Sequence, residues 1–309
     1  MAVHFSYLKN KTVVVLGASS GFGRGTALKL GKLGANVVIA ARRGGALTDI
    51  VTQIEAAGGH GMAVPTDISD PEQVAALASE AVERFGNLDV WINNVGVGAL
   101  GFFWDIPIED HARVIDVNLK GLIYGAHAAL SRFHSQGYGT LINVGSIDSE
   151  VPLAYQASYA ASKAGVLSLS RSLNEELRLS GSDRIKVATI MPWAVDTPWW
   201  LHAANYTGHA PRMAAMDDPE IVVNAIVSAC IDPKEEMPVG WKAHASNVSH
   251  HIFPDLTERL SAKIADQEVK KAQPFAASTG ALHAPMAGTE KIDGGVRIRM
   301  KAEDGTGDR

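Results

Sequence analysis

The sequence predicts an α/β protein built on a doubly wound parallel sheet, and two observations support this fold class. Short apolar runs rich in β-branched residues alternate with segments of helical apolar spacing along the first 245 residues. A glycine-rich turn stands between the first such run and the first helical segment. Alternation of this kind indicates about seven parallel strands, with helices on both faces and a ligand crevice at the carboxyl ends of the strands.

Each expected element follows from its own pattern. The strands are short apolar runs, as strands covered on both faces are, whereas the helices repeat apolar residues every three or four positions. The expected strands lie near residues 12–16, 36–41, 61–65, 88–92, 139–145, 185–191 and 237–242. The expected helices lie near residues 22–33, 46–57, 71–85, 107–135, 157–180 and 219–231.

Composition is typical of a soluble globular protein with a large core, because 46% of the 309 residues are hydrophobic and 20% are charged. The net charge of −5 gives no indication of a nucleic-acid or anionic membrane partner. The single cysteine, Cys230, is expected to be buried and inert, and it fits a reducing compartment. Residues 1–11 lack the apolar core of a signal peptide, and residues 95–104 are too short an apolar stretch to span a bilayer. We therefore expect a cytoplasmic protein.

The turn after the first strand predicts a nucleotide site. It reads Gly17-Ala-Ser-Ser-Gly-Phe-Gly23 and leads into a helical pattern. Gly17 permits the tight turn, Gly21 lets the backbone approach a ligand, and Gly23 lets the helix pack closely on the strand. Backbone N–H groups and the helix N-terminus would then face an anionic phosphate. The alternative is a plain turn between a strand and a helix.

The end of the second strand predicts the choice of cofactor. A site selective for NAD places an acidic residue there to accept a hydrogen bond from the ribose 2′-hydroxyl. Here the positions read Ala40, Ala41, Arg42 and Arg43, without a carboxylate. Two guanidinium groups suit a 2′-phosphate, which they can hold by charge-assisted hydrogen bonds. We therefore expect NADP(H), although Arg43 could instead be a solvated loop residue.

A proton-transfer pair is predicted farther along the chain. Tyr159 and Lys163 are four residues apart in an expected helix, so they share one face, and Ser146 lies thirteen residues before the tyrosine. A free tyrosine has a pKa of about 10, and a nearby cation lowers that pKa by favouring the phenolate. Taken alone, the spacing favours a solvated helix face over a proton-transfer pair.

Together, these motifs resemble the short-chain dehydrogenase/reductase superfamily, in its single-domain branch, from about Leu8 to about Ala243. The resemblance implies a Rossmann-like fold and hydride transfer between a nicotinamide cofactor and a carbonyl or secondary alcohol. It implies four catalytic residues: Asn118, Ser146, Tyr159 and Lys163. It implies cofactor contacts from Gly17, Ser19, Ser20, Gly21, Phe22, Gly23, Arg42, Arg43, Asp67, Ile68, Asn94, Gly96, Tyr159, Lys163, Pro192, Val195 and Thr197.

The resemblance also implies a role for each matched polar residue. Asp67 would bind the adenine amino group, and Ser146 would orient the substrate oxygen. Tyr159 would exchange a proton with that oxygen, while Lys163 would lower the tyrosine pKa and bind the nicotinamide ribose. Asn118 would hold a water in the proton relay. A catalytically silent redox sensor is the alternative, but such a protein would be expected to lack one of these groups.

Two positions depart from the family pattern. Leu16 stands where the family usually has a threonine. That threonine has a structural role and no catalytic one, so its replacement should have little effect on function. Trp193 replaces the glycine that usually follows Pro192, so it would either add an apolar wall beside the nicotinamide or shift the loop. The contacts expected from Val195 and Thr197 depend on which of these occurs.

Residues 198–213 correspond to the variable substrate lid of the family. Their aromatic content predicts a cover for a hydrophobic substrate, and an interface or core patch is the alternative of equal standing. His202 and His209 lack carboxylate or cysteine support at metal-ligand spacing, so no metal site is expected.

We divide the chain into a dinucleotide-binding and catalytic domain, residues 1–245, and a C-terminal extension, residues 246–309. The extension is expected to hold a helix near residues 254–271, followed by an extended or disordered tail whose apolar residues could instead pack on a neighbouring subunit. The family resemblance implies a homodimer or homotetramer formed through the helices near residues 107–135 and 157–180.

Overall fold

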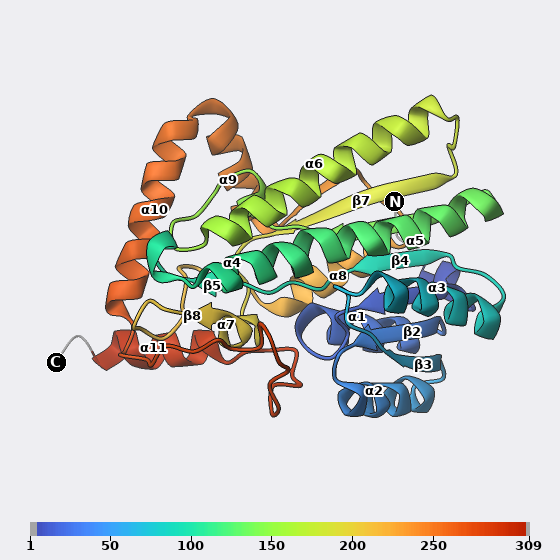
Figure 1. The fold of residues 1–309 in the computed structure, drawn as a ribbon, viewed down its shortest axis with the longest axis horizontal. Helices are drawn as coiled ribbons and strands as arrows, with labels where there is room; N and C mark the ends of the chain where they lie inside the picture. Colours follow the sequence, from blue (N-terminus) through green and yellow to red (C-terminus); the bar gives the residue numbers. More distant parts are fainter. Residues whose placement is uncertain (1–4, 307–309) are drawn as a thin grey trace.

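The computed structural model describes residues 5–306. Within them, seven strands form one parallel sheet in the order β3-β2-β1-β4-β6-β7-β9 (Figure 1). Their bounds are Thr12–Leu16 (β1), Asn36–Ala41 (β2), His60–Pro65 (β3), Val90–Asn93 (β4), Gly139–Val144 (β6), Ile185–Pro192 (β7) and Glu236–Val239 (β9). The order reverses direction between β1 and β4, which is where a doubly wound sheet opens its ligand crevice. The predicted fold class is confirmed.

Helices cover both faces of the sheet. One face carries α1 (Gly21–Lys32), α2 (Gly44–Ala56) and α8 (Pro219–Ala229), and the other carries α3 (Pro71–Phe85), α5 (Gly121–Gln136) and α6 (Ala157–Leu179). Side chains of β1 alternate between the two cores, with Val13 and Val15 on the first face and Val14 and Leu16 on the second. All four are buried, which explains why the strand is continuously apolar.

The predicted helix near residues 107–135 is interrupted. It consists of α4 (Ile108–Ile115), a π-helical turn (η3, Asp116–Lys120) and α5. The predicted strand near residues 237–242 ends at Val239, because Gly240 begins a helix, α9 (Gly240–Ile252), that the sequence pattern did not predict. Short elements complete the core: η1 (Phe5–Leu8), β5 (Ala99–Leu100), η2 (Phe103–Asp105), η4 (Ile147–Ser149), α7 (Trp199–His202) and β8 (Ala204–Asn205).

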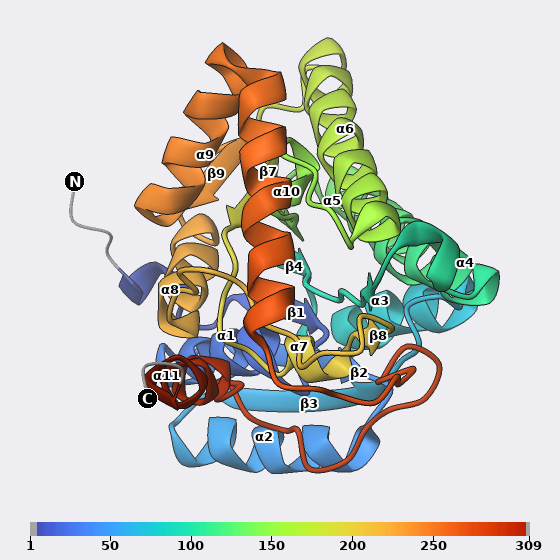
Figure 2. The same cartoon turned by 90° about the vertical axis from the view of Figure 1, so that its left-hand side faces the viewer.

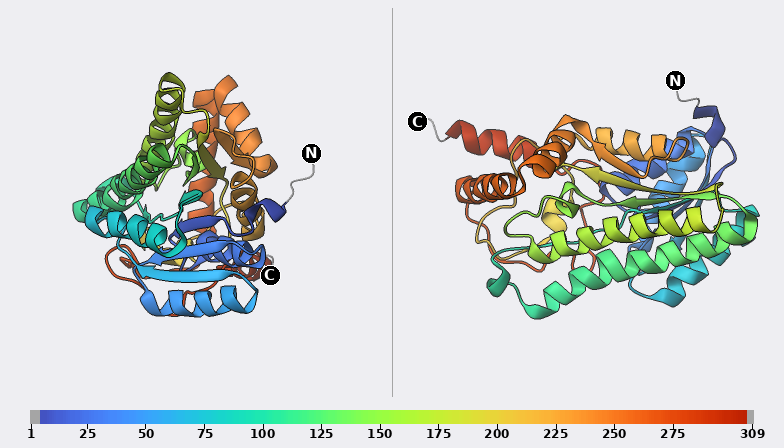
Figure 3. Two further views of the ribbon diagram at one scale, coloured as in Figure 1. Left: turned by 90° about the vertical axis from the view of Figure 1, so that its right-hand side faces the viewer. Right: turned by 90° about the horizontal axis from the view of Figure 1, so that it is seen from above.

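The C-terminal extension lies at the end of the molecule opposite η1 (Figure 3, right). Helices α9 and α10 (Pro254–Lys271) stand side by side there. Residues 272–295, which we call the strap, then run past α7 and the ends of β2 and β3 to the last helix, α11 (Val296–Thr306) (Figure 2).

The strap is extended and packs on its own chain. Asn205 and His209 of the lid, residues 198–213, form isolated antiparallel bridges with Ser278 and Pro274 of the strap. Leu282 is fully buried in the core that contains β1 and β4. Burial of this apolar side chain and pairing of the strap backbone hold the strap against the lid and the sheet. Among residues 5–306, no helix is both long enough and apolar enough to cross a bilayer.

Candidate active site

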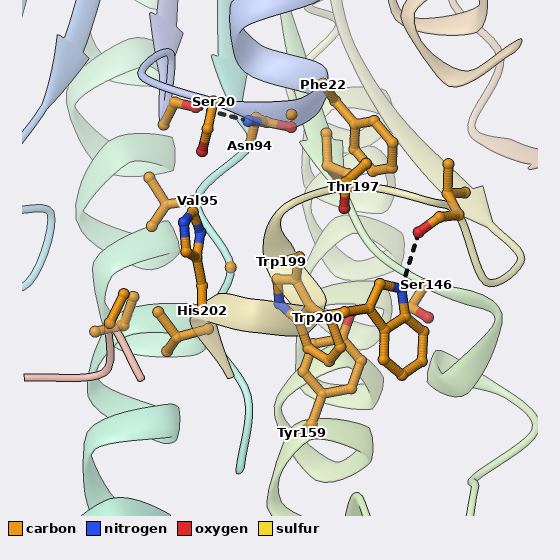
Figure 4. A pocket seen from close by; sticks show the side chains of 18 of the residues that line it. Ser20, Phe22, Asn94, Val95, Ser146, Tyr159, Thr197, Trp199, Trp200 and His202 are labelled. Carbon is orange, nitrogen blue, oxygen red and sulfur yellow. Dashed lines mark hydrogen bonds between the residues drawn. The ribbon is translucent and has the colours of Figure 1, made fainter. Parts of the chain in front are cut away.

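A cavity opens at the carboxyl ends of the central strands, between the lid and the strap (Figure 4). Its wall contains almost all of the predicted site residues. These are Gly17, Ser19, Ser20, Gly21, Phe22, Arg42, Arg43, Asp67, Ile68, Asn94, Gly96, Ser146, Tyr159, Lys163, Pro192, Val195 and Thr197. The two exceptions, Gly23 and Asn118, lie behind the wall, and both are described below.

The glycine-rich turn has the geometry that a phosphate cradle needs. Gly17 and Gly21 adopt left-handed backbone angles, with φ of +77° and +54°, which glycine alone adopts readily. A Cβ atom on Gly23 would lie 2.2 Å from the carbonyl oxygen of Gly17, so this glycine allows α1 to pack under the turn. Oδ1 of Asn94, beside the turn, is buried without a hydrogen-bond partner among the described residues. The turn therefore fits a dinucleotide phosphate.

Strap groups surround the two arginines predicted to bind the 2′-phosphate. Arg42 donates to the carbonyl oxygens of Ala281, at 2.6 Å, and His283, at 3.2 Å. Arg43 donates to Ser19 Oγ at 2.9 Å and lies 3.3 Å from the carboxylate of Glu290. It also donates to Met286 O and Thr289 Oγ1. Arg43 is thus not a solvated loop residue.

The strap also reaches the nucleotide turn itself. The backbone N–H of Gly21, the first residue of α1, donates to the carbonyl oxygen of Lys291 at 2.8 Å. Ala281, Pro285 and Met286 contribute directly to the cavity wall. The sequence did not predict these contacts, because nothing in a local pattern links the two ends of the chain.

Asp67 presents an ionised carboxylate to the cavity. Burial alone would raise the pKa of Asp67, but hydrogen bonds from the backbone and hydroxyl of Ser69 and the charge of Arg113 outweigh burial and lower it. Arg113 lies 3.2 Å from Oδ2 and was not predicted. Its carboxylate oxygens can accept a hydrogen bond from an adenine amino group.

Three of the predicted catalytic groups meet although they come from separate elements. Ser146 begins η4 directly after β6, whereas Tyr159 and Lys163 lie near the start of α6. The Tyr159 hydroxyl is close enough to Ser146 for the serine side chain to influence its pKa. Nζ of Lys163 donates to the carbonyl oxygen of Val144 at 2.8 Å and lies 5.7 Å from the centroid of the Tyr159 ring.

The predicted depression of the Tyr159 pKa by Lys163 is wrong in this structure. Burial raises the pKa of Tyr159 above its ordinary value, the carboxyl group of Asp148 raises it further, and the Ser146 side chain only partly opposes them. Burial also lowers the pKa of Lys163 to about 8, against the attraction of Asp148. Tyr159 is therefore a neutral phenol that carries its proton at neutral pH.

Asn118 lies in the π-helical turn and is not part of the cavity wall. Its Oδ1 accepts from the backbone N–H of Val97 at 2.8 Å, and its Nδ2 donates to Val97 O and Ser162 Oγ. Both amide hydrogens are used, so the side chain links the loop after β4 to α6 next to Lys163. π-Helical turns are frequent at functional sites.

Aromatic and aliphatic side chains of the lid and its neighbours form the remaining wall. Trp199 lies over Tyr159 with ring centroids 5.1 Å apart, and Trp200 is buried with its Nε1 donating to Val195 O at 2.9 Å (Figure 4). Trp193 lines the cavity, and β7 still ends at Pro192, so the tryptophan adds an apolar wall. Leu153 and Met213 extend the same wall.

The two lid histidines make structural contacts. His202 points into the cavity, and its Nε2 is 2.7 Å from Thr289 Oγ1 of the strap. Burial and the charge of Arg43 lower the pKa of His202 to about 4, so it is neutral. His209 bonds to the backbone of Thr207 in its own loop.

Comparison with known proteins agrees with this geometry. The family described as short chain dehydrogenase matches residues 11–205. The chain is 35% identical over 260 residues to YxnA of Bacillus subtilis, named an uncharacterized oxidoreductase, covering 83% of this chain and 73% of the relative. It is 41% identical over 210 residues to 3beta-hydroxysteroid dehydrogenase 1 of Eggerthella lenta, covering 67% of this chain and 78% of the relative.

A solved structure is similar over nearly its whole length. A short chain dehydrogenase/reductase from Burkholderia phymatum in complex with NAD superposes with a TM-score of 0.70 at 26% identity, covering 87% of this chain and 99% of the other. The nucleotide turn, the meeting of Ser146, Tyr159 and Lys163, and these matches lead to one conclusion. The chain belongs to the short-chain dehydrogenase/reductase superfamily, whose oxidoreductases act on alcohol and carbonyl groups.

Proposed function

We propose that this protein is an NADP(H)-dependent oxidoreductase that interconverts a hydrophobic carbonyl compound and its secondary alcohol. The observation that carries the proposal is the meeting of Ser146, Tyr159 and Lys163 on an apolar cavity that continues to the nucleotide turn. The aromatic lid and the similarity to a hydroxysteroid dehydrogenase support a hydrophobic substrate.

The cofactor, when bound, supplies or receives the hydride. In the reductive direction, Tyr159 donates its phenolic proton to the substrate oxygen, while Ser146 hydrogen-bonds that oxygen and holds it near the phenol. The raised pKa of Tyr159 suits this direction, because the group is protonated before reaction. Lys163 uses one hydrogen for Val144 and keeps others for the nicotinamide ribose. Trp199 packs against the aromatic ring of Tyr159.

The proposed preference for NADPH rests on charge at the adenosine end of the cavity. Arg42 and Arg43 both line it, and the end of β2 carries no carboxylate. Equilibrium binding of NADPH and NADH, followed by cofactor fluorescence, tests this part alone. Tighter binding of NADH would overturn the preference and leave the hydride chemistry standing.

Replacing Tyr159 with phenylalanine tests the chemistry. The variant should lose at least about 100-fold in turnover, because general acid catalysis contributes on that scale, while its affinity for NADPH stays within about twofold. Turnover is followed by NADPH absorbance against a panel of ketones and aldehydes. Substantial residual activity in the variant would refute the assignment. Tight NADPH binding by the wild type without turnover of any compound would instead favour the redox sensor.

We further propose a cytoplasmic homodimer or homotetramer that uses α5 and α6. Support comes from a groove between α3 and α5 that exposes apolar side chains, including the 40% exposed Ile123. Light scattering of the wild type and of Ile123→Glu tests the assembly. A wild-type monomer would contradict it.

A further inference from the structure

One carboxyl group in the cavity has no part in the chemistry described so far. Asp148 lies in η4, two residues after Ser146, and it lines the cavity while being only 4% exposed. Its backbone N–H donates to Ser146 Oγ at 3.1 Å, which fixes its position relative to the catalytic serine. Its Oδ1 is enclosed and has no hydrogen-bond partner among residues 5–306.

Neighbouring residues do not satisfy this carboxyl group. Lys163 is close enough to interact with it electrostatically, but the lysine ammonium donates to the backbone of Val144. On the other side, Ile147 and Val151 form an apolar cluster with Trp193. Burial without a partner raises the pKa of Asp148 to about 7, and Lys163 only partly opposes this effect. Tyr159 interacts with the carboxyl group electrostatically, but no hydrogen bond joins the two side chains among the described residues.

Buried polar groups in native proteins almost always have hydrogen-bond partners, so an orphaned one needs an explanation. Because Asp148 lines a cavity, a ligand bound there can bring a donor to the other carboxyl oxygen, Oδ2, which is not among the enclosed unpaired atoms. Because Asp148 is two residues from Ser146, a ligand donor that binds its carboxyl group would lie close to the substrate oxygen that Ser146 holds. An apolar substrate with a single ketone would leave the carboxyl group unpaired.

We propose that Asp148 determines substrate specificity by accepting a hydrogen bond from a hydroxyl or ammonium group beside the reacting carbonyl carbon. The preferred substrates are then α-hydroxy or α-amino ketones with an apolar remainder, and the products are the corresponding diols or amino alcohols. This inference rests on the proposed function, since Ser146 must hold the carbonyl oxygen for Asp148 to meet the adjacent group.

Matched substrates isolate this contact. Acetophenone, 2-hydroxy-1-phenylethanone and 2-amino-1-phenylethanone share one apolar body and differ only in the group on the carbon beside the carbonyl. A hydrogen bond to a charged group contributes about 1.5–3 kcal/mol, so the wild type should favour a donor-bearing ketone by about 10- to 100-fold in kcat/KM. The hydroxy and amino compounds distinguish the two kinds of donor.

Two substitutions show whether Asp148 is responsible. Asp148→Leu removes the acceptor and keeps a side chain of similar length, so the preference should fall to within about twofold of unity. Asp148→Asn keeps one neutral acceptor and should give an intermediate ratio. Asp183→Leu is the matched control: it removes an exposed carboxylate before β7, at the opposite end of the sheet from the cavity, and should leave the ratio unchanged.

A binding measurement separates this inference from the proposed function. Trp193 and Trp199 line the cavity, so quenching of tryptophan fluorescence can report binding of 1-phenyl-1,2-ethanediol and 1-phenylethanol. The wild type should bind the diol about tenfold more tightly, and Asp148→Leu should bind both alike. Discrimination in binding without turnover of any ketone would support the inference and defeat the proposed function. Equal turnover of all three ketones by the wild type, or discrimination retained in Asp148→Leu, would overturn the inference.

Discussion

Arg212 connects the lid to helices α10 and α11 of the C-terminal extension, and its replacement should lower the stability of the folded protein. Its guanidinium group pairs with Glu268 of α10 at 2.8 Å and with Glu303 and Asp304 of α11, each at 2.9 Å. The arginine side chain is 1% exposed, and those of Glu268 and Glu303 are 8% and 11% exposed. Arg212→Met would keep the packing of the stem and remove the charge.

The cost follows from the carboxylates that remain. Removing one partner of a buried ion pair costs about 3–5 kcal/mol, because the other charge stays buried without compensation. Lys271 lies 3.2 Å from Glu268, and Arg299 lies 3.5 Å from Glu303, so both acids keep a second cation. We therefore expect a loss of about 3 kcal/mol, at the lower end of the range.

Urea unfolding and hydrogen exchange test this expectation together. The urea midpoint should fall, and amide exchange should accelerate first in α10 and α11. The matched control is Arg178→Met, because Arg178 also pairs with two acids, Glu175 and Glu235, but on the surface, where no measurable change is expected. Equal effects of the two substitutions, or an unchanged midpoint for Arg212→Met, would refute the reasoning.

Three further perturbations have defined outcomes. Gly23→Ala should abolish dinucleotide binding in a fluorescence titration, because the new Cβ would meet a carbonyl oxygen at 2.2 Å, whereas Gly45→Ala has nothing within 4 Å and should bind normally. Glu290→Gln should tighten NADPH binding by about fivefold, since a partly buried pair with Arg43 at 3.3 Å is worth about 1 kcal/mol and competes with the phosphate; unchanged affinity would contradict the competition. Burial raises the pKa of Asp148 from 3.8 to about 7 in the folded protein. Between pH 3.8 and 7 the folded state therefore keeps a proton on Asp148 that the unfolded state has lost. The free energy of unfolding should consequently fall by up to about 4 kcal/mol as the pH rises across this range. Asp148→Asn should remove that decline in melting temperature, and a decline that persists would exclude Asp148 as its source.

The sequence predicted well those elements whose cause is local. Apolar runs identified the first six strands of the sheet to within two residues, whereas β9 ends three residues earlier than predicted; the glycine spacing identified the turn after β1. Helix α9 escaped prediction because several of its apolar side chains, among them Trp241, Val248 and Ile252, are exposed and form no buried stripe. The catalytic spacing identified Tyr159 and Lys163 but gave the wrong direction for the tyrosine pKa. That direction depends on burial and on Asp148, and sequence spacing carries no information about burial.

The choice between NADP(H) and NAD(H) depends on a contact that the local sequence at the end of β2 cannot predict. The end of β2 offers two arginines and no acid, but the strap brings the Glu290 carboxylate to Arg43 from 247 residues away. Two cations and one anion leave a net attraction for a 2′-phosphate that is weaker than Arg42 and Arg43 alone would provide. The same carboxylate is an acceptor that a ribose 2′-hydroxyl could use. The ratio of NADPH to NADH affinity should therefore rise in Glu290→Gln and fall in Arg43→Gln. An unchanged ratio in Glu290→Gln would show that the residues at the end of β2 alone determine the cofactor preference.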